Sequence, residues 1–376
     1  MNQATKRTWA EIDLSNLEHN YLALRGMLPR GCRFMGVVKA NAYGHGAIPV
    51  AKKLVDLGVE YLAVACLDEA VELRQVGISA PILILGPTLP GFTDELFLHD
   101  LTQAVQDVAL AKALSDAAVK AGKTLKIHIK IDTGMSRLGF LCNETAMEDS
   151  VEKIAKVCSL PGLEHEGIFT HFAHADGGEE YTMRQFTRFM DALDKLSERG
   201  VRFEIRHCAA SAAVLNYPCT HLDMIRAGIA QYGHYPDPSC EGLGGPGLLP
   251  LMTLKTRVIA LRELEKGTCI SYGCTHSLAR DSRVAVLPVG YADGFERLLS
   301  NRSEVLIQGV RVPILGRVCM DLCMVDVTDV AGIHVGDEVI VFGPDLPLEE
   351  KADTIGTIQY EMLCGISRRV PRVYID

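Results

Sequence analysis

Short apolar runs alternate with helical patterns from about residue 34 to residue 232. The apolar runs are nearly continuous, which is typical of strands buried on both faces of a parallel sheet. The segments between them repeat apolar residues at i, i+3 and i+4, as amphipathic helices do. The pattern predicts eight strands, over residues 34–38, 61–65, 81–85, 101–105, 125–131, 166–170, 202–207 and 222–225, and helices over 47–57, 67–76, 110–121, 147–158 and 183–199.

Eight strand–helix units within roughly 200 residues favour a closed (β/α)8 barrel, the TIM-barrel architecture. An open, doubly wound parallel sheet is the main alternative. A glycine- and proline-rich stretch within residues 236–250 then indicates an interdomain linker. Its glycines superficially resemble a dinucleotide-binding loop. However, Pro246 interrupts the pattern, no strand precedes it and no acidic residue follows at the expected distance.

Period-2 alternation dominates the rest of the chain and predicts a β-rich second domain. Its strands are predicted over residues 254–264, 284–289, 304–307, 312–318, 323–327, 338–342 and 370–375. Residues 8–13 predict one more strand, followed by a helix over 17–28 that Asp13 or Ser15 caps. A closed barrel has no place for a strand before its first helix. We therefore assign residues 14–240 to the α/β barrel, and 1–13 plus 241–376 to the β-rich domain.

Composition narrows the range of partners. The 376 residues carry 38 Lys+Arg against 47 Asp+Glu, a formal charge of -9, and no basic run, so we expect no nucleic-acid partner. The 12 cysteines include no C-x-x-C pair, which excludes a zinc-ribbon site, and their apolar surroundings suit reduced thiols in the cytoplasm. We expect neither a secretion signal nor a membrane span, because no apolar run reaches 18 residues.

Polar groups follow the predicted strands where a parallel barrel places its active site. Lys39 follows the first strand in VVKANAYGHG. Such a lysine pairs with a carboxylate, stays in solvent at the rim, or has its pKa lowered by desolvation and acts as an amine nucleophile. The small residues around Tyr43 allow a ligand to approach the backbone. Later strands are followed by Lys130 and Arg137 in KIDTGMSRLGF, His171 in THFAHAD, Ser211 in HCAASAA, and Arg226, Gly228 and Ile229 in RAGI.

Ser211 with Gly228 and Ile229 lies in the loops after strands seven and eight, where barrels of this kind often bind phosphate. We therefore predict a phosphate site there. Lys130 and Arg137 would repel each other in one pocket unless one of them is neutralised.

Six motifs in a fixed order, VVKANAYGHG, KIDTGMSRLGF, RAGIAQYG, SYGCTH, PVGYADGF and GRVCMD, resemble those of the pyridoxal-phosphate-dependent alanine racemases. The resemblance runs from about Thr8 to Arg372. It implies a (β/α)8 barrel followed by a β domain and a pyridoxal 5'-phosphate (PLP) cofactor. It further implies a homodimer with shared active sites and an isomerase that converts L-alanine to D-alanine for peptidoglycan, the bacterial cell wall. The expected partner is thus a small amino-acid substrate.

The resemblance also implies residue roles. Lys39 would be the Schiff-base lysine and one catalytic base, and Tyr272, reaching in from the partner subunit, would be the other. Arg226 would face the ring nitrogen, and His171 would pack beside the ring. The phosphate would be held by Tyr43, Ser211, Gly228, Ile229 and Tyr360. The substrate carboxylate would be held by Arg137 and the Met320 N–H, with Asp321 beside them. Lys130 matches a lysine that is carbamylated in some members and helps fix Arg137, and His207 and Tyr291 match supporting positions.

These residue types suit racemisation, because a proton that leaves one face and returns to the other needs two bases. Arginine only donates hydrogen bonds, so at Arg226 it should leave the ring nitrogen unprotonated and limit side reactions such as transamination. Two positions depart from the family pattern: Ala210 stands where many relatives have Asn, and Leu322 where many have Gln.

Structural roles are the alternatives at single positions. Arg226 would pair with Asp223, His171 would be a satisfied core histidine, and Tyr272 would fill the core of a sheet. Three alternative functions are also open. They are a serine racemase related to those of vancomycin resistance, against which Tyr360 argues, a decarboxylase on a related barrel, and a non-catalytic PLP carrier, against which the second domain argues.

Overall fold

The computed structural model describes residues 7–241 and 246–376, which form two compact units. The barrel unit comprises Glu18–Ala42 and Ala47–Leu248. The strand-rich unit comprises residues 7–17, Tyr43–Gly46 and Leu249–Asp376. Four residues of the first long loop, Tyr43–Gly46, thus belong to the unit formed mainly by the C-terminal third of the chain. Part of the predicted linker, residues 242–245, lies outside the described residues.

The barrel unit contains all eight predicted strands, paired in the order β10-β2-β3-β4-β5-β6-β8-β9. The two ends of this series meet through a parallel bridge between Ala210 and Arg226 and a hydrogen bond from Asp223 N to Arg206 O of 3.1 Å. The barrel is therefore confirmed over the open sheet. The strands are β2 (Arg33–Val37), β3 (Tyr61–Val64), β4 (Ile82–Ile84), β5 (Thr102–Val105), β6 (Leu125–Asp132), β8 (Leu163–Phe169), β9 (Ile205–His207) and β10 (Met224–Ala227), and β7 (Phe140–Leu141) pairs with β6.

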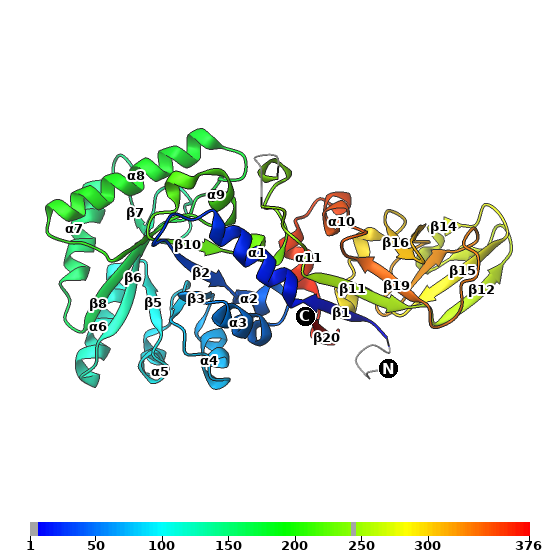
Figure 1. The fold of residues 1–376 in the computed structure, drawn as a ribbon, viewed down its shortest axis with the longest axis horizontal. Coiled ribbons are helices and arrows are strands. Elements are labelled where there is room, and N and C mark those ends of the chain that lie inside the picture. Colours follow the sequence, from blue (N-terminus) through cyan, green and yellow to red (C-terminus); the bar gives the residue numbers. More distant parts are fainter. Residues whose placement is uncertain (1–6, 242–245) are drawn as a thin grey trace. The chain divides into compact units, whose positions relative to one another are not determined.

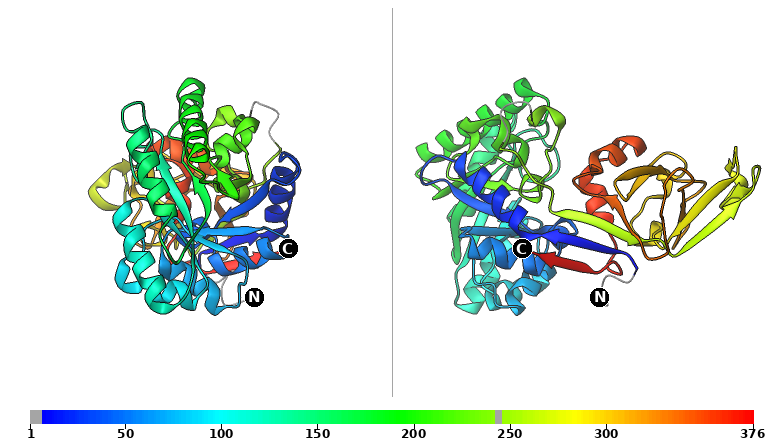
Figure 2. Two further views of the ribbon diagram at one scale, coloured as in Figure 1. Left: turned by 90° about the vertical axis from the view of Figure 1, so that its left-hand side faces the viewer. Right: turned by 45° about the vertical axis from the view of Figure 1, so that its right-hand side comes forward.

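Helices surround these strands (Figure 1, Figure 2). In α6 the buried residues Leu110, Ala111, Leu114 and Ala118 recur at helical spacing, and the Asp107 side chain caps the first turn by accepting from Leu110 N at 2.8 Å. The helices are α3 (Ala47–Asp56), α4 (Leu67–Gln75), α5 (Thr93–Leu98), α6 (Val108–Ala121), α7 (Met147–Cys158), α8 (Glu179–Glu198) and α9 (Ser211–Asn216). The sequence pattern missed α5 and α9, which are too short to show a period.

Helix α1 (Leu14–Gly26) begins where the sequence indicated a cap. Asp13 is the capping residue, since its carboxylate accepts from Ser15 N at 2.9 Å and Asn16 N at 3.1 Å. No helix within residues 7–241 and 246–376 combines the length and the apolar character that crossing a membrane requires.

The strand-rich unit has a six-stranded sheet in the order β17-β16-β19-β11-β1-β20. β1 (Trp9–Asp13) pairs antiparallel with β11 and parallel with β20, so the N-terminal strand lies in this sheet, as predicted. The other strands are β11 (Met252–Arg257), β16 (Glu304–Ile307), β17 (Val310–Pro313), β19 (Glu338–Phe342) and β20 (Arg372–Ile375).

Smaller sheets and two helices complete this unit. The prediction of one strand over residues 254–264 was wrong, because β12 pairs with β15 in a separate sheet. The alternation continues through the break, where Val258 N donates to Asp337 O and Ile259 N to Val286 O. The remaining elements are β12 (Ala260–Leu264), β13 (Cys269–Ile270), β14 (His276–Ser277), β15 (Ser282–Leu287), β18 (Cys323–Asp326), α10 (Leu348–Ile355) and α11 (Gln359–Gly365).

Candidate active site

Lys39 opens α2 (Lys39–Tyr43), a turn of left-handed backbone directly after β2. The φ angles are +53° at Ala40, +54° at Asn41, +53° at Ala42 and +49° at Tyr43. Left-handed conformation costs about 1–2 kcal/mol per non-glycine residue, so tertiary contacts have to hold four of them in succession. Strain of this kind is concentrated at functional sites. It therefore supports a functional role for the lysine that the turn carries.

Two side chains fix this turn within the barrel unit. Asn41 Oδ1 accepts from Ala47 N at 2.9 Å. The Glu69 carboxylate accepts from Ala40 N and from Ala65 N, each at 2.7 Å, and so joins the turn to the end of β3. The sequence indicated neither role. Ala40 and Ala65, which Glu69 joins, are distant from each other along the chain.

The glycines that follow serve close packing rather than ligand access. Within the strand-rich unit, a Cβ on Gly44 would lie 2.1 Å from Leu363 O, and one on Gly46 would lie 1.9 Å from Tyr374 Oη. Arg372 Nε also donates to Gly44 O at 2.9 Å. The sequence interpretation of small residues as space for a ligand is thus not the reason for glycine at these two positions.

The strand ends of the barrel unit bring four cationic side chains into electrostatic contact. Burial lowers the pKa of Lys130 on β6 to about 8, and the charges of Arg137, Arg226 and Lys39 act in the same direction. Lys130 Nζ lies 5.5 Å from the ring centroid of Phe169, and the Arg226 guanidinium carbon lies 5.4 Å from it. The expected repulsion between Lys130 and Arg137 is thus present. An excess of positive charge of this kind favours an anionic ligand.

Arg137 lies on an exposed loop whose backbone is held by one carboxylate. Asp132, the last residue of β6, accepts from the backbone N–H groups of Gly134 (2.9 Å), Ser136 (3.0 Å) and Arg137 (3.2 Å). The loop also requires Gly139, where a Cβ would lie 2.8 Å from the backbone of Ile131. Asp132 stands inside the KIDTG motif, but its role as an anchor of this loop became evident only from the fold.

Arg226 on β10 is buried, and no carboxylate is among its hydrogen-bond partners in the described part of the chain. The alternative pairing with Asp223 is wrong, since Asp223 accepts from Arg206 Nε at 2.6 Å. The terminal nitrogens of Arg226 instead donate to the carbonyl oxygens of Thr170 (2.8 Å), Cys208 (3.0 Å) and His207 (3.1 Å). Burial lowers the pKa of Arg226 to about 10, which leaves it charged at neutral pH.

Two imidazoles complete the surroundings of Arg226. One of its terminal nitrogens lies 3.0 Å from His207 Nδ1 and the other 3.2 Å from His171 Nδ1. Arginine can only donate, so both Nδ1 atoms accept and both rings carry their proton on Nε2. Burial, together with the charge of Arg226, holds the pKa of each histidine well below its ordinary value. Among the residues that the structure describes, Arg226 Nε–H has no hydrogen-bond partner.

Ser211, Gly228 and Ile229 come together after β9 and β10. Ser211 Oγ accepts from Gly228 N at 3.0 Å and from Ala230 N at 3.2 Å. Ile229 begins the short helix η4 (Ile229–Tyr232). The phosphate residues predicted from the barrel unit therefore form one cluster at the carboxyl ends of two strands.

The predicted residues Tyr43 and Tyr360 meet within the strand-rich unit. Their ring centroids are 5.9 Å apart and the rings are nearly perpendicular, at 81°. Such an edge-to-face arrangement is favourable for aromatic pairs. Burial raises the pKa of Tyr43 above its ordinary value, so its hydroxyl stays protonated and can donate a hydrogen bond.

Tyr272 is presented to solvent on the strand-rich unit. Its ring is 72% exposed, so the alternative that it fills the core of a sheet is wrong for this chain. It lies between Ser271 (φ +66°) and Gly273 (φ +74°), both with left-handed backbone. Together with Met320, which is 53% exposed, it borders a pocket of about 320 Å³ lined by Ser271, Tyr272, Cys319, Met320, Asp321, Leu322 and Met324.

The backbone of this pocket is tied to a neighbouring loop. The N–H groups of Tyr291 and Ala292 donate to the carbonyl oxygens of Cys319 and Met320, each at 3.0 Å. Gly290 permits this approach, because a Cβ there would lie 2.4 Å from both carbonyl oxygens. The supporting position predicted at Tyr291 thus contacts the Met320 loop through its backbone.

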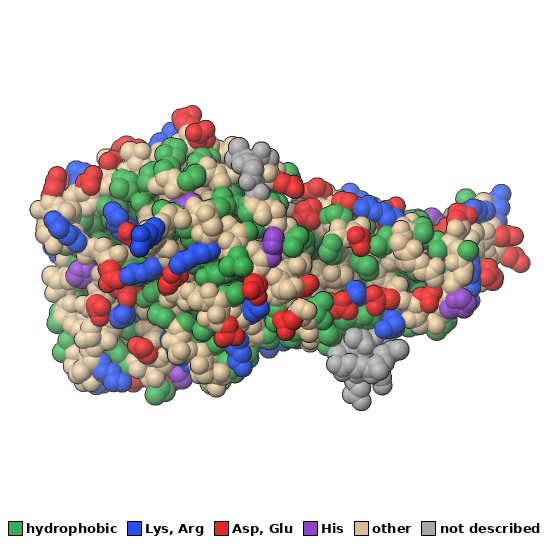
Figure 3. All heavy atoms as spheres, viewed as in Figure 1, with side chains coloured by type: hydrophobic (Ala, Val, Ile, Leu, Met, Phe, Trp, Pro, Cys, Tyr) green, Lys and Arg blue, Asp and Glu red, His purple; other side chains and the backbone are tan. Residues whose placement is uncertain are grey.

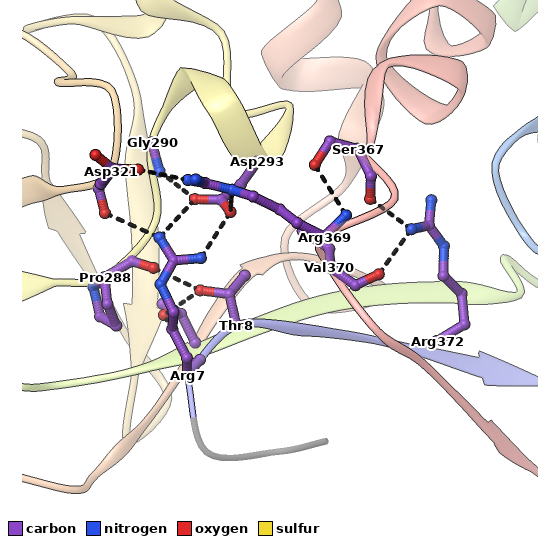
Figure 4. A network of polar contacts seen from close by, with 11 residues as sticks. Arg7, Thr8, Pro288, Gly290, Asp293, Asp321, Ser367, Arg369, Val370 and Arg372 are labelled. Carbon is purple, nitrogen blue, oxygen red and sulfur yellow. Dashed lines mark hydrogen bonds and ion pairs between the residues drawn. The ribbon is translucent and has the colours of Figure 1, made fainter. Parts of the chain in front are cut away.

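An ionic network lies behind this loop (Figure 4). The buried Asp293 carboxylate accepts from Arg7 at 2.7 Å, from Arg369 at 2.7 Å and from Gly290 N at 2.9 Å. Arg369 also donates to the Asp321 carboxylate at 2.8 Å. The Asp321 carboxylate is therefore paired with an arginine of its own chain. Asp293 stands inside the PVGYADGF motif, but the sequence did not indicate its pairing with Arg7 and Arg369, since the three residues are distant along the chain.

The surface bears charges of both signs. On the face that Figure 3 shows, Lys and Arg side chains are interspersed with Asp and Glu.

Fold and site together define the class of protein: a (β/α)8 barrel enzyme with a cationic site at the strand ends and a second, strand-rich unit. The family model of the alanine racemase N-terminal domain matches residues 12–236, and that of the alanine racemase C-terminal domain matches residues 251–374. The chain belongs to the alanine racemase family.

Curated relatives agree over almost the whole chain. It is 47% identical to an alanine racemase of Desulforamulus reducens, with 98% of both chains covered. It is 44% identical to an alanine racemase of Clostridium perfringens, covering 100% of this chain and 97% of the relative.

Solved structures show the same fold. The alanine racemase of Clostridium difficile matches with a TM-score of 0.94 at 42% identity, covering 98% of this chain and 96% of that one. The alanine racemase of Bacillus anthracis with bound L-Ala-P matches with a TM-score of 0.91 at 36% identity, covering 99% and 95%. These matches do not favour a carrier or a decarboxylase.

Proposed function

We propose that this protein interconverts L-alanine and D-alanine with pyridoxal 5'-phosphate as cofactor. The observation that carries the proposal is that family membership spans both units and includes Lys39 and Tyr272. D-alanine formed in this way would supply peptidoglycan precursors in the cytoplasm. A cationic site with one lysine on a strained turn suits a phosphorylated aldehyde cofactor, whose aldehyde would be held by the Lys39 amine.

The residues present fit this cofactor. Ser211 Oγ and the N–H groups of Gly228 and Ile229 would hold the phosphate, with the hydroxyls of Tyr43 and Tyr360 as further donors. The unpartnered Nε–H of the buried Arg226 would donate to the ring nitrogen, and His171 would lie beside the ring. When bound, the cofactor withdraws electrons and stabilises negative charge at the substrate α-carbon.

The two proposed bases, Lys39 Nζ and Tyr272 Oη, would exchange the α-proton on opposite faces of the substrate. Lysine and tyrosine have ordinary pKa values of about 10, so a base that works near neutral pH needs surroundings that lower its pKa. In the single chain Tyr272 is 72% exposed. We therefore propose a homodimer in which the partner subunit covers Tyr272 and uses it as its second base.

Arg137 and the Met320 N–H would bind the substrate carboxylate. Lys130, with its pKa lowered to about 8, would be partly neutral near physiological pH and thus able to react with carbon dioxide. The resulting carbamate would replace a positive by a negative charge and would hold Arg137 by an ion pair.

Chiral product analysis tests the proposal. Purified protein with added PLP is incubated with L-alanine and, separately, with other L-amino acids, including L-serine. D-alanine should form, with kcat/KM for L-alanine above that for L-serine, since the Tyr360 ring restricts the space beside the substrate. A ratio below one would identify a serine racemase instead. An inactive protein that still binds PLP would indicate a carrier.

A further inference from the structure

A line of buried polar side chains runs from Arg226 through the inside of the barrel unit. Arg226 donates to His207 Nδ1 at 3.0 Å. His207 Nε2 lies 2.9 Å from His128 Nδ1, and His128 Nε2 lies 3.1 Å from a carboxylate oxygen of Glu166. Both histidines are 0% exposed. The line joins β10, β9, β6 and β8 and ends in an ionised group at each end.

The chemistry of the two ends decides where every proton lies. Arginine has only donors, so His207 Nδ1 accepts and its proton is on Nε2. That N–H donates to His128 Nδ1, which places the proton of His128 on Nε2 as well. The second N–H donates to Glu166, which as a carboxylate can only accept. Two neutral imidazoles therefore satisfy all three hydrogen bonds, and each donor points away from Arg226 toward Glu166.

The charges around this line agree with that assignment. Burial lowers the pKa of His128, and burial with the charge of Arg226 lowers that of His207, so both rings stay neutral. Burial alone would raise the pKa of Glu166, but hydrogen bonds from His128, Lys126 and Tyr61 outweigh it and hold it at about 2. Glu166 is thus an ionised carboxylate, paired with Lys126 at 2.8 Å, that accepts at the far end of the line from Arg226.

Other neighbours offer no substitute for Glu166. Phe169 stacks on His207 with ring centroids 4.8 Å apart and an angle of 13°, and it has no hydrogen-bonding group. The charged groups that act on Lys130 together with Arg226 are the cations Arg137 and Lys39 and the carboxylate of Asp132, which already accepts from backbone N–H groups of its own loop. Without a carboxylate at position 166, only Arg226 still fixes the direction of donation, and a group at 166 that donates to His128 Nε2 would compete by reversing both imidazoles. His207 would then present an N–H on Nδ1 toward the N–H groups of Arg226.

We propose that Glu166 is a positioning residue that acts through His128 and His207 to fix the orientation of Arg226 in the barrel. The inference deepens the proposed function, since Arg226 is the residue that we propose to face the ring nitrogen of the cofactor. Glu166 itself contacts neither substrate nor cofactor in this account. Its effect is that His207 Nδ1 remains an acceptor and that the Arg226 guanidinium, which donates to it, keeps one orientation.

Imidazole ¹⁵N NMR of the full chain, labelled at histidine and measured without substrate, tests the line directly. Single His→Gln variants assign the signals. In the wild-type protein, His128 and His207 should both be neutral and protonated on Nε2. A proton on Nδ1 of His207, or a charged ring at either position, would overturn the proposal without recourse to any variant.

Glu166→Gln then removes the charge and replaces a group that can only accept by an amide that can also donate to His128 Nε2, while the size of the side chain is kept. We expect a mixture of His207 tautomers, a PLP dissociation constant raised about tenfold and kcat lowered about tenfold with KM nearly unchanged. Glu166→Asp should recover part of each loss. The matched control is Glu164→Gln, the same change two residues away on β8 at an exposed position.

The outcomes are separable from those of the proposed function. Unchanged His207 tautomer and PLP affinity in folded Glu166→Gln would refute the positioning role, even if the protein racemises alanine. If the tautomers behave as expected but no D-alanine is formed, the line stands and the proposed function fails. If Glu166 only stabilised the fold, both Glu166→Gln and Glu166→Asp would unfold at a lower temperature, and their His207 tautomers would be those of the wild-type protein. That result would refute the positioning role.

Discussion

The Arg369 guanidinium donates to the Asp293 carboxylate over 2.7 Å, across 76 residues of sequence. Asp293 is completely buried, and its second cationic partner is Arg7. Because the loop that contains Asp293 also binds the backbone of Met320, this ion pair supports the wall of the pocket beside Tyr272. The stability of the strand-rich unit should therefore depend on the charge of the Asp293 carboxyl group.

Replacing Asp293 with Asn should lower the free energy of unfolding by about 2–3 kcal/mol, since two charge-assisted hydrogen bonds are weakened. Burial opposes ionisation of Asp293, but Arg7, Arg369 and Gly290 N hold its pKa below the ordinary value. The carboxylate thus contributes stability above a pH of about 4, and the contribution is lost as the pH falls through the folded-state pKa. Urea unfolding from pH 7 to pH 3 measures this. The difference in free energy of unfolding between the wild-type protein and Asp293→Asn should shrink at acid pH. A constant difference would contradict the role assigned to the Asp293 carboxylate.

Gly46→Ala should destabilise the protein by about 2–4 kcal/mol, because the new Cβ would lie 1.9 Å from Tyr374 Oη and Gly46 has a φ of +102°. Gly58→Ala is the matched control. It has a φ of +90° with no atom within 4 Å, so only the backbone strain of about 1 kcal/mol applies. Thermal unfolding should show a clearly larger loss for Gly46→Ala, with partial recovery in combination with Tyr374→Phe. Equal losses would mean that the steric contact is relieved at no cost.

Lys130 should take up carbon dioxide, because its lowered pKa of about 8 leaves a neutral amine fraction near physiological pH. Carbon-13 NMR in labelled bicarbonate should show a carbamate signal that is absent in Lys130→Met and grows as the pH rises from 7 to 8.5. Lys120→Met, on the outer helix α6, is the control and should keep the signal. A signal that persists in Lys130→Met would assign the carbamate to another amine.

Mixing inactive Lys39→Ala and Tyr272→Phe subunits should restore activity if each site takes these residues from different chains. With random exchange, half of the dimers are hybrids and one of their two sites is intact, so about a quarter of the wild-type activity should return. The measurement is D-alanine formation after mixing in mild denaturant and dilution. Complete lack of recovery, with hybrids demonstrated by mass spectrometry, would place both residues in one chain's site.

Arg226→Glu should increase the fraction of turnovers that end in transamination, because a carboxyl group can share a proton with the ring nitrogen and an arginine cannot. Pyruvate formed per D-alanine is the quantity to follow. Burial of an acid among the carbonyl oxygens of Thr170, Cys208 and His207 also costs stability, so circular dichroism has to establish that the variant is folded. An unchanged pyruvate ratio in folded protein would refute the role of Arg226.

The hydrophobic pattern determined the barrel and the N-terminal strand of the β-rich domain. Strands buried on both faces form continuous apolar runs, amphipathic helices repeat at 3.6 residues, and half-buried strands repeat at 2. Motif order determined the family and pointed to Lys39, Arg226 and Tyr272. Periodicity failed where the chain changes sheet without a change of pattern, as at Val258 and Ile259 between β11 and β12.

Only the tertiary structure decided which groups support those motifs. Glu69 and Glu166 look like ordinary acidic residues in the sequence, and the PVGYADGF motif did not reveal the partners of Asp293, because a hydrogen bond between distant segments leaves no local pattern. The left-handed turn after Lys39 was equally hidden, since its residues are alanine, asparagine and tyrosine rather than glycine. Its conformation is imposed by contacts from Glu69 and Ala47. The local sequence thus specified the reacting groups, and long-range packing specified the directions in which they are held.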